Sequence, residues 1–237
     1  MVYSDPHECS QLNELKVDMS VLNTISGWHS AGDIIMVEQM PMFGGYAGGA
    51  EETAICDIAT TLASFVVFNS DIHLDGPIHI RWGTTTTRDT LKVASHVAAA
   101  LDYNTDLLLA NQYYTMAGPC TEMCLLETAA QAIADTASGR ELLSGVASAK
   151  GVALDKVTGM EARMLGEASA ATCGMEVHTV NEILDRIVSR YEMNFFNAPG
   201  GKRYQECYNV NDATPTNEYL NLYDNVLDIL SDCGLGF

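Results

Sequence analysis

A single carboxylate interrupts the first apolar run of the chain. The run DIIMVEQM, from Asp33 to Met40, is apolar through its centre and carries Glu38 near its end. In barrels of parallel strands the reacting groups lie at the carboxyl ends of the strands, and burial raises the pKa of a carboxyl group there. Glu38 is therefore a candidate for proton transfer. The alternative is a structural hydrogen bond that closes the strand end.

Two later apolar runs also end in polar side chains. The run from Pro77 to Gly83 ends in Arg81 and Trp82. The run from Leu107 to Tyr114 ends in an amide and phenol quartet, Asn111, Gln112, Tyr113 and Tyr114. If these runs are parallel strands, their polar ends meet at one edge of the sheet. Glu8, in DPHECSQLNELK, precedes a helical pattern and by itself reads as a surface carboxylate at a helix start.

Cysteine and histidine give weaker candidates. Cys120 and Cys124, in GPCTEMC, lie one helical turn apart, but no second Cys or His pair with zinc spacing accompanies them, so no metal site is predicted. His73 and His79 are interpreted as rim histidines rather than ligands. The loop FGGYAGG lacks the Gly-Lys-Ser/Thr of a phosphate-binding loop, so we expect a rim loop or a docking surface.

Charge and composition exclude several classes of partner. The chain carries 12 basic and 31 acidic residues and a net charge of −19, which argues against nucleic acid and anionic membranes as partners. Its seven cysteines are an odd number in a chain that is not small, so a disulfide framework is not expected. The first residues lack the basic region and apolar run of a signal peptide, and the longest apolar stretch contains Asp57. We therefore expect a cytoplasmic protein.

The elements that position these residues read as repeated strand–helix units. Apolar runs at 33–40, 77–83, 107–114 and 141–147 are the expected strands, and helices are expected to begin near Glu51, Thr87 and Thr121. A spacing of roughly 30 to 45 residues per unit fits an α/β barrel or a doubly wound sheet. Four parallel strands are half of an eight-stranded barrel and cannot close, so two edges would stay open.

The remainder is predicted to be helical, without a linker or a repeat. One helix is expected over Lys156–Thr172. A second follows a capping box of Thr179 and Glu182, and the last has Thr214 as its cap and Pro215 at its first position, and stops at Gly234. The whole chain, 1–237, is thus expected to be one α/β domain with extra C-terminal helices.

Long collinear strings give a family resemblance. They include DIIMVEQMPMFGGYAGG, HLDGPIHIRWG, NQYYTMAGPCTEMCLLE, ADTASGRELLSGVASAKGV and TGMEARMLGEA. On these strings the chain, from about Ser4 to Phe237, resembles the monomethylamine methyltransferases of methylotrophic methanogens. The resemblance implies a (β/α)₈ barrel of the TIM type, of which this chain would be the C-terminal half.

The resemblance also implies a chemistry. The family's reactive residue is pyrrolysine, encoded by an amber codon in the N-terminal half and absent here; its imine is the electrophile that holds methylamine. The methyl group then passes to the Co(I) of a separate corrinoid protein, so the cofactor is carried by that partner and none is bound directly. Four positions match the family's ring-contacting residues: Glu8, Glu38, Gln112 and Tyr114. Glu38 would exchange a proton with the ring nitrogen or the amine, Glu8 would assist amine deprotonation, and Gln112 and Tyr114 would orient the bound amine.

Three functions remain open at this point. The first is a corrinoid-dependent methylamine methyltransferase of methanogenesis, with this chain inactive alone as a fragment. The second is another barrel methyltransferase that does without pyrrolysine. The third is a non-catalytic half-barrel that binds a corrinoid protein or forms a homo-oligomer through its open edges.

The resemblance leads to a prediction about the gene. We expect an in-frame UAG a few tens of codons before Met1, preceded by an open frame of similar length, because the family places pyrrolysine shortly before the matching segment. Sequencing the locus is the test. A normal intergenic region with its own promoter would contradict the expectation.

Overall fold

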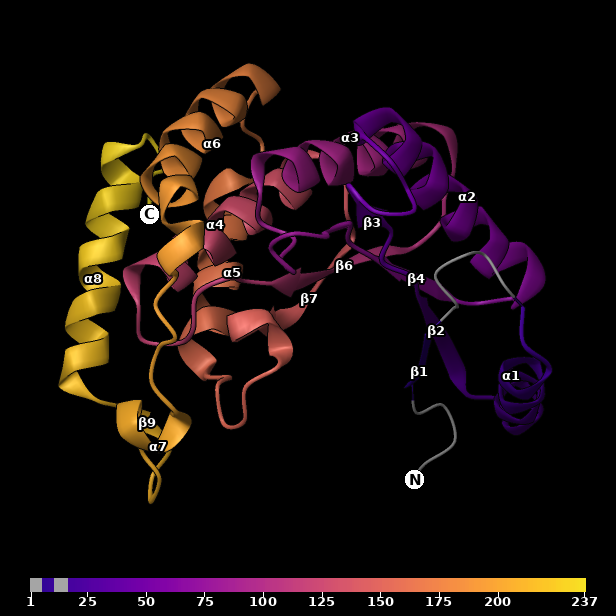
Figure 1. The fold of residues 1–237 in the computed structure, drawn as a ribbon, viewed down its shortest axis with the longest axis horizontal. Coiled ribbons are helices and arrows are strands. Elements are labelled where there is room, and N and C mark those ends of the chain that lie inside the picture. Colours follow the sequence, from indigo (N-terminus) through magenta and orange to yellow (C-terminus); the bar gives the residue numbers. More distant parts are fainter. Residues whose placement is uncertain (1–5, 11–16) are drawn as a thin grey trace.

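The chain folds around a curled sheet of five parallel strands. The computed structural model describes residues 6–10 and 17–237. Its main sheet has the order β1-β2-β4-β6-β7, so each strand pairs with the next one along the chain (Figure 1). The strands are β1 Pro6–Ser10, β2 Ile34–Glu38, β4 Ile72–Asp75, β6 Leu109–Tyr114 and β7 Leu142–Ala147. Within the described ranges β1 and β7 each pair on one side only, so both edges are open.

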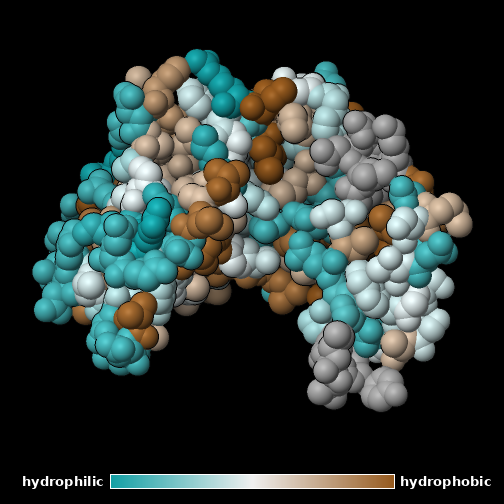
Figure 2. Space-filling model, turned by 60° about the horizontal axis from the view of Figure 1, so that its bottom comes forward, coloured by the Kyte–Doolittle hydropathy of each residue, from teal (hydrophilic) through white to brown (hydrophobic). Residues whose placement is uncertain are grey.

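Helices cover one face of this sheet. The helices between the strands are α1 Met19–Ala31, α2 Ala50–Val67, α3 Arg88–Asn104 and α4 Glu122–Ala137. On β2, Ile35 and Val37 are 0% and 1% exposed, whereas Ile34 on the opposite face is 37% exposed. The alternation follows from the two-residue period of a strand. We call the face that no described helix covers the inner face, and Figure 2 shows that side of the molecule hollowed, with hydrophobic side chains along its middle.

Threonine caps set the starts of the two central helices. Thr87 accepts a hydrogen bond from the Thr90 amide at 3.1 Å, and Thr121 accepts one from the Cys124 amide at 3.2 Å. The two helix starts were predicted from the sequence and are confirmed, and both caps satisfy amides that have no partner inside the helix. The predicted apolar face of α3 is also confirmed, because each of its members is buried: Leu91, Ala94, Val97, Ala98 and Leu101.

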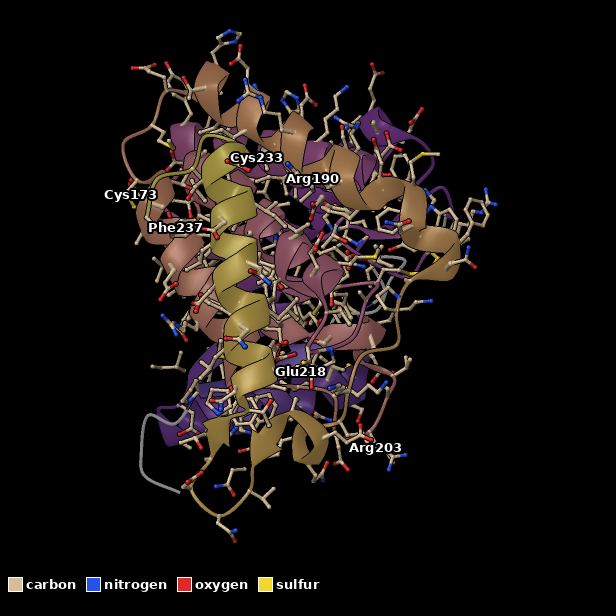
Figure 3. The ribbon with its side chains drawn as sticks, turned by 90° about the vertical axis from the view of Figure 1, so that its left-hand side faces the viewer. Cys173, Arg190, Arg203, Glu218, Cys233 and Phe237 are labelled. Atoms are coloured by element: carbon tan, nitrogen blue, oxygen red, sulfur yellow. The ribbon has the colours of Figure 1, made fainter. Side chains whose placement is uncertain are left out.

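The C-terminal third adds a helical layer beside the sheet. Its longer elements are α5 Gly159–Thr172, α6 Val177–Tyr191 and α8 Asn217–Asp232, with the short elements η1 Ser148–Gly151, η2 Glu192–Asn197 and α7 Tyr204–Cys207. Two small sheets pair β3 (Met42–Phe43) with β5 (Ile78–His79) and β8 (Tyr208–Asn209) with β9 (Thr214–Pro215). In Figure 3, α8 runs along the side of the molecule from Glu218 to Cys233. No helix in the described part of the chain is long and apolar enough to cross a membrane.

Helix α4 joins the sheet to this layer. Every residue of α4 from Met123 to Asp135 is buried, and the helix contacts β6, β7, α5, α6 and α8. Its alanines let neighbouring helices approach closely, and the large side chains of α8, including Tyr219 and Tyr223, complete the core. The layer is therefore packed onto the sheet largely through one helix that is buried on all sides, with α5 also contacting β7.

The structure corrects the second predicted strand. The sheet strand is IHLD at 72–75, and the predicted run 77–83 contributes only the two-residue β5 to a separate small sheet. Arg81 and Trp82 accordingly lie in a loop rather than at the end of a main strand. His73 is fully buried within β4, so its interpretation as a rim histidine was wrong. The strand was missed because His73 and Asp75 are polar yet buried, which hides the apolar pattern.

Two helix starts and one strand also differ from the prediction. Helix α6 begins at Val177, so the predicted cap Thr179 lies inside the helix. Helix α8 begins after Thr216, whose hydroxyl accepts a hydrogen bond from the Tyr219 amide, and the predicted cap Thr214 lies in β9. Glu8 is in the strand β1, not at a helix start. Most of the helical pattern expected after Glu8, at 12–17, lies outside the described residues. For α8, Thr214 and Thr216 offer the same cap chemistry two residues apart, so spacing alone could not choose between them, whereas α6 begins after Glu176 without a side-chain cap.

A buried arginine links the sheet to its helices. The side chain of Arg140 has no exposed surface and pairs with Asp75 of β4 at 2.7 Å and Asp135 of α4 at 3.1 Å. It also donates to the backbone oxygens of Ala110 in β6 and Ala94 in α3, at 3.1 and 3.3 Å. One guanidinium thus joins two strands and two helices.

The groups around Arg140 hold fewer charges than their types suggest. Burial raises the pKa of Asp75 to about 6, although Arg140 opposes this, and burial followed by repulsion from Asp75 raises the pKa of Asp57 well above its usual range. Burial and then Arg140 lower the pKa of His73 to about 3, so its ring is neutral at pH 7. Because the His73 ring is neutral, it adds no positive charge beside Arg140, which faces its two bonded aspartates.

Replacing Arg140 is expected to destabilise the protein severely. Arg140→Met removes the cation but leaves Asp75 and Asp135 buried, which should cost about 3–5 kcal/mol of unfolding free energy. Urea denaturation of the purified protein measures this. The control is Arg190→Met, on the exposed surface of α6 (Figure 3), which should change the unfolding free energy by less than about 0.5 kcal/mol. Equal effects of the two substitutions would contradict the assigned role of Arg140.

Candidate functional site

Two glutamates from neighbouring strands meet on the inner face. Parallel pairing of β1 with β2 places Ser10 opposite Glu38, and Glu8 lies two residues before Ser10 on the same face. The Ser10 hydroxyl donates a hydrogen bond of 2.8 Å to a carboxylate oxygen of Glu38. Ser10 was not predicted. The two-residue alternation of β1 could have found it, had that segment been recognised as a strand.

The carboxyl groups of Glu8 and Glu38 lie close enough to interact. Burial raises the pKa of Glu8, and repulsion from Glu38 and a hydrogen bond between the two side chains raise it further. A hydrogen bond between two carboxyl groups requires a proton on one of them, because two carboxylates are both acceptors. The pair can therefore present one ionised and one protonated carboxyl group at the same place.

A tyrosine and a glutamine from β6 complete the cluster. The half-buried phenol of Tyr114 has a raised pKa, first because of burial and then because of the negative charges of Glu38 and Glu8, so it lies near both carboxyl groups. Gln112 lies two residues before Tyr114 on the same face of β6. Its Oε1 is buried and accepts no hydrogen bond from the described residues. All four predicted site residues thus lie in main-sheet strands, and three of them interact directly.

This arrangement suits a small nitrogen ligand. The cluster offers carboxylate oxygens that accept protons, an unsatisfied amide oxygen that accepts a hydrogen bond, and a phenol that can donate or accept one. An amine supplies the N–H donors that these acceptors lack. Among the described residues no group of three or more His, Cys, Asp or Glu side chains could hold a metal ion.

The other polar residues considered from sequence lie elsewhere. The Arg81 guanidinium stacks on the rings of Trp82 and Phe196, at 4.6 and 4.8 Å from their centres. Cys124 is buried, with its Sγ 3.4 Å from the Thr115 hydroxyl and 3.6 Å from the Ser148 hydroxyl. None of these side chains belongs to the carboxyl pair on the inner face.

A parallel α/β sheet with paired carboxyl groups and an unsatisfied amide oxygen on its inner face offers the groups with which a site can accept protons and hydrogen bonds from a small polar molecule. The family model "Monomethylamine methyltransferase MtmB" matches residues 1–235, and the chain belongs to this family. The family was predicted from the quoted strings and is confirmed.

Relatives and solved structures agree with the family and set the extent of the match. The chain is 58% identical to monomethylamine methyltransferase MtmB1 of Methanosarcina acetivorans and 57% identical to MtmB1 of Methanosarcina barkeri, in each case over 100% of this chain and 52% of the relative. It superposes with a TM-score of 0.98 and 57% identity on the crystal structure of the Methanosarcina barkeri monomethylamine methyltransferase, and equally on a hydroxylamine complex of MtmB. The chain thus spans about half the length of the relatives that it matches.

The shared proton predicts a coupled titration. In Glu38→Gln the like charge is removed, so the pKa of Glu8 should fall toward 4.5, without reaching it because burial, the largest cause of the shift, remains. Carboxyl-¹³C glutamate NMR measures the titration, with Glu8→Gln to assign the resonance. The exposed Glu51→Gln serves as a control and should leave the Glu8 curve unchanged. An identical Glu8 pKa in Glu38→Gln and wild type would show that the two carboxyl groups are not coupled.

Proposed function

We propose that the full-length protein transfers the methyl group of monomethylamine to the Co(I) of a separate corrinoid protein. The observation that carries this proposal is the register of β1, β2 and β6, which gathers Glu8, Glu38 and Tyr114 on one exposed face. Membership of the monomethylamine methyltransferase MtmB family supports the substrate and the reaction. A relative was solved as a hydroxylamine complex, which supports a small amine as the ligand of this face.

We also propose that the sheet is part of a closed (β/α)₈ barrel. The open sides of β1 and β7 support this, because unpaired strand edges present backbone groups that need partners. Exposed apolar side chains on the inner face, such as Ile34 and Leu142 at 37% and 42%, support it as well. A further segment of the length that the relatives possess would pair both edges and bury this face.

In this proposal each residue of the cluster has a separate task. The ionised member of the Glu8–Glu38 pair takes a proton from the ammonium nitrogen of methylamine, and the protonated member donates to the group that receives the amine. Gln112 Oε1 accepts an N–H of the substrate, and the Tyr114 hydroxyl fixes its direction. Ser10 holds the Glu38 carboxylate in place through its 2.8 Å hydrogen bond.

The electrophile and the cobalt would come from outside this chain. As the family resemblance implies, pyrrolysine in the preceding segment supplies an imine that receives the amine, and a cognate corrinoid protein supplies the methyl acceptor. The buried, unsatisfied Gln112 Oε1, on the same face of the sheet as the carboxyl pair, fits an amine held on that face. This chain alone, without the electrophile, should therefore show no methyl transfer.

The reaction gives a direct test of Glu38. In the full-length protein Glu38→Gln should lower methyl transfer by at least about 100-fold, because Gln keeps the shape but cannot exchange a proton at neutral pH. The measurement is methylamine-dependent methylation of Co(I) corrinoid protein, followed by absorbance, together with thermal melting.

A second carboxylate provides the matched control. Glu141 accepts a hydrogen bond of 2.9 Å from the Leu109 amide at the start of β6, far along the strand from the cluster, so Glu141→Gln should keep nearly full activity. If Glu38→Gln also melts like wild type and keeps its rate, Glu38 is only a structural residue at a strand end. Turnover by this chain alone would overturn the proposed mechanism.

A further inference from the structure

The strand that carries Gln112 and Tyr114 leaves its regular pairing between them. In the pairing of β6 with β7, Gln112 lies opposite Ser144 and Tyr113 opposite Val146, so Gly145 of β7 is the extra residue of a bulge that interrupts the ladder. A bulge disrupts the ladder locally, so the backbone groups of the facing strand β6 need other partners. The direction of Tyr114 relative to Gln112 therefore depends on whatever holds the backbone here.

Two buried side chains hold it. The Tyr114 amide donates to the Thr85 hydroxyl at 3.1 Å, and that hydroxyl donates to Gln131 Oε1 at 2.5 Å. Gln131 Nε2 in turn donates to the backbone oxygen of Gln112 at 3.2 Å. The Thr85 amide also donates to the backbone oxygen of Tyr114 at 3.1 Å. The chain of bonds begins at one site residue and ends at the other, on both sides of the bulge.

Both relay residues are anchored away from the inner face. Thr85 is 2% and Gln131 1% exposed, and Gln131 belongs to α4, the helix buried on all sides. The Thr85 hydroxyl both donates and accepts, and Gln131 Oε1 and Nε2 each have a hydrogen-bond partner, so every polar side-chain atom of the relay is bonded. Such a satisfied buried network favours one backbone geometry over alternatives.

We propose that the Thr85–Gln131 relay is a positioning device for this site: it fixes the backbone of β6 opposite the bulge of β7, and thereby the placement of Gln112 and Tyr114 against the Glu8–Glu38 pair. The proposal rests on the proposed function for its catalytic consequence. Thr85 and Gln131 bond each other and the backbone of Tyr114 and Gln112, and neither side chain belongs to the cluster itself. Their removal should therefore slow the reaction through misplacement, and a misplacement near 1 Å can cost about 100-fold in rate.

Two substitutions of Thr85 distinguish the contribution of its hydroxyl group from the contribution of its methyl group. Thr85→Val keeps the shape but removes the hydroxyl, and Thr85→Ser keeps the hydroxyl but removes a methyl group. In the full-length protein we expect kcat for methylamine to fall at least about tenfold in Thr85→Val and to stay within about twofold of wild type in Thr85→Ser. The matched control is Thr128→Val. It also removes a buried hydroxyl, which lies in α4 and donates a hydrogen bond of 2.8 Å to the Cys124 backbone oxygen within that helix. It should lower the melting temperature similarly without changing kcat.

A spectroscopic measurement tests the relay without relying on turnover. With 3-fluorotyrosine in place of tyrosine, the ¹⁹F resonance of residue 114, assigned by Tyr114→Phe, should shift as the nearby carboxyl pair titrates. Thr85→Val should weaken this response, and Thr85→Ser and Thr128→Val should keep it. If wild-type protein proves unable to methylate corrinoid, the proposed function fails and this response alone decides the relay. The relay is overturned if Thr85→Val matches Thr128→Val in the fluorine response, or in kcat where wild type is active.

Discussion

A guanidinium without access to solvent organises this protein. Arg140 joins β4, β6, α3 and α4, and its bonds to Asp75, Asp135 and Ala110 O are all within 3.1 Å. A buried cation is tolerated only when carboxylates and carbonyl oxygens replace its water, which ties its neighbours to fixed positions. Asn111 donates to both oxygens of Asp135 at 2.8 Å, so β6 is held twice, through its backbone and through a side chain. The outer face of β6 is thus fixed one residue before Gln112 appears on the inner face.

The two faces of the sheet therefore have different tasks. Helix-facing residues carry the charge network that positions the strands, and inner-face residues carry the groups that can exchange protons. Because successive side chains alternate between faces, Asn111 and Gln112, or Tyr113 and Tyr114, serve the two tasks in turn. Helix α4 contributes to both, since its Asp135 accepts a hydrogen bond from Asn111 of β6 and its Gln131 donates one to the backbone oxygen of Gln112.

The elements that depend on residues close to them in the chain were predicted correctly from the sequence. The apolar runs of β2, β6 and β7, and the caps at Thr87 and Thr121, depend on neighbours within a few residues, and they were found from the sequence. The strand β4 was missed because Asp75 is stabilised by Arg140, 65 positions later, and no window of sequence shows that pairing. Glu38, Gln112 and Tyr114 were visible as polar ends of apolar runs. Glu8 came from the family resemblance alone, since its strand is short and its neighbours look helical.

The place of Glu8 in the sheet gives the carboxyl pair a second property. Glu8 lies on β1, an edge strand that, in the described ranges, is held by β2 alone, whereas Glu38 lies one strand further in. Edge strands open locally at a lower free energy than central ones, and any opening of β1 would separate the two carboxyl groups and release their common proton site. The pKa of Glu8 therefore depends on the free energy needed to separate β1 from β2. Anything that seals that edge, another strand included, would tune the acid–base chemistry of the inner face without touching it.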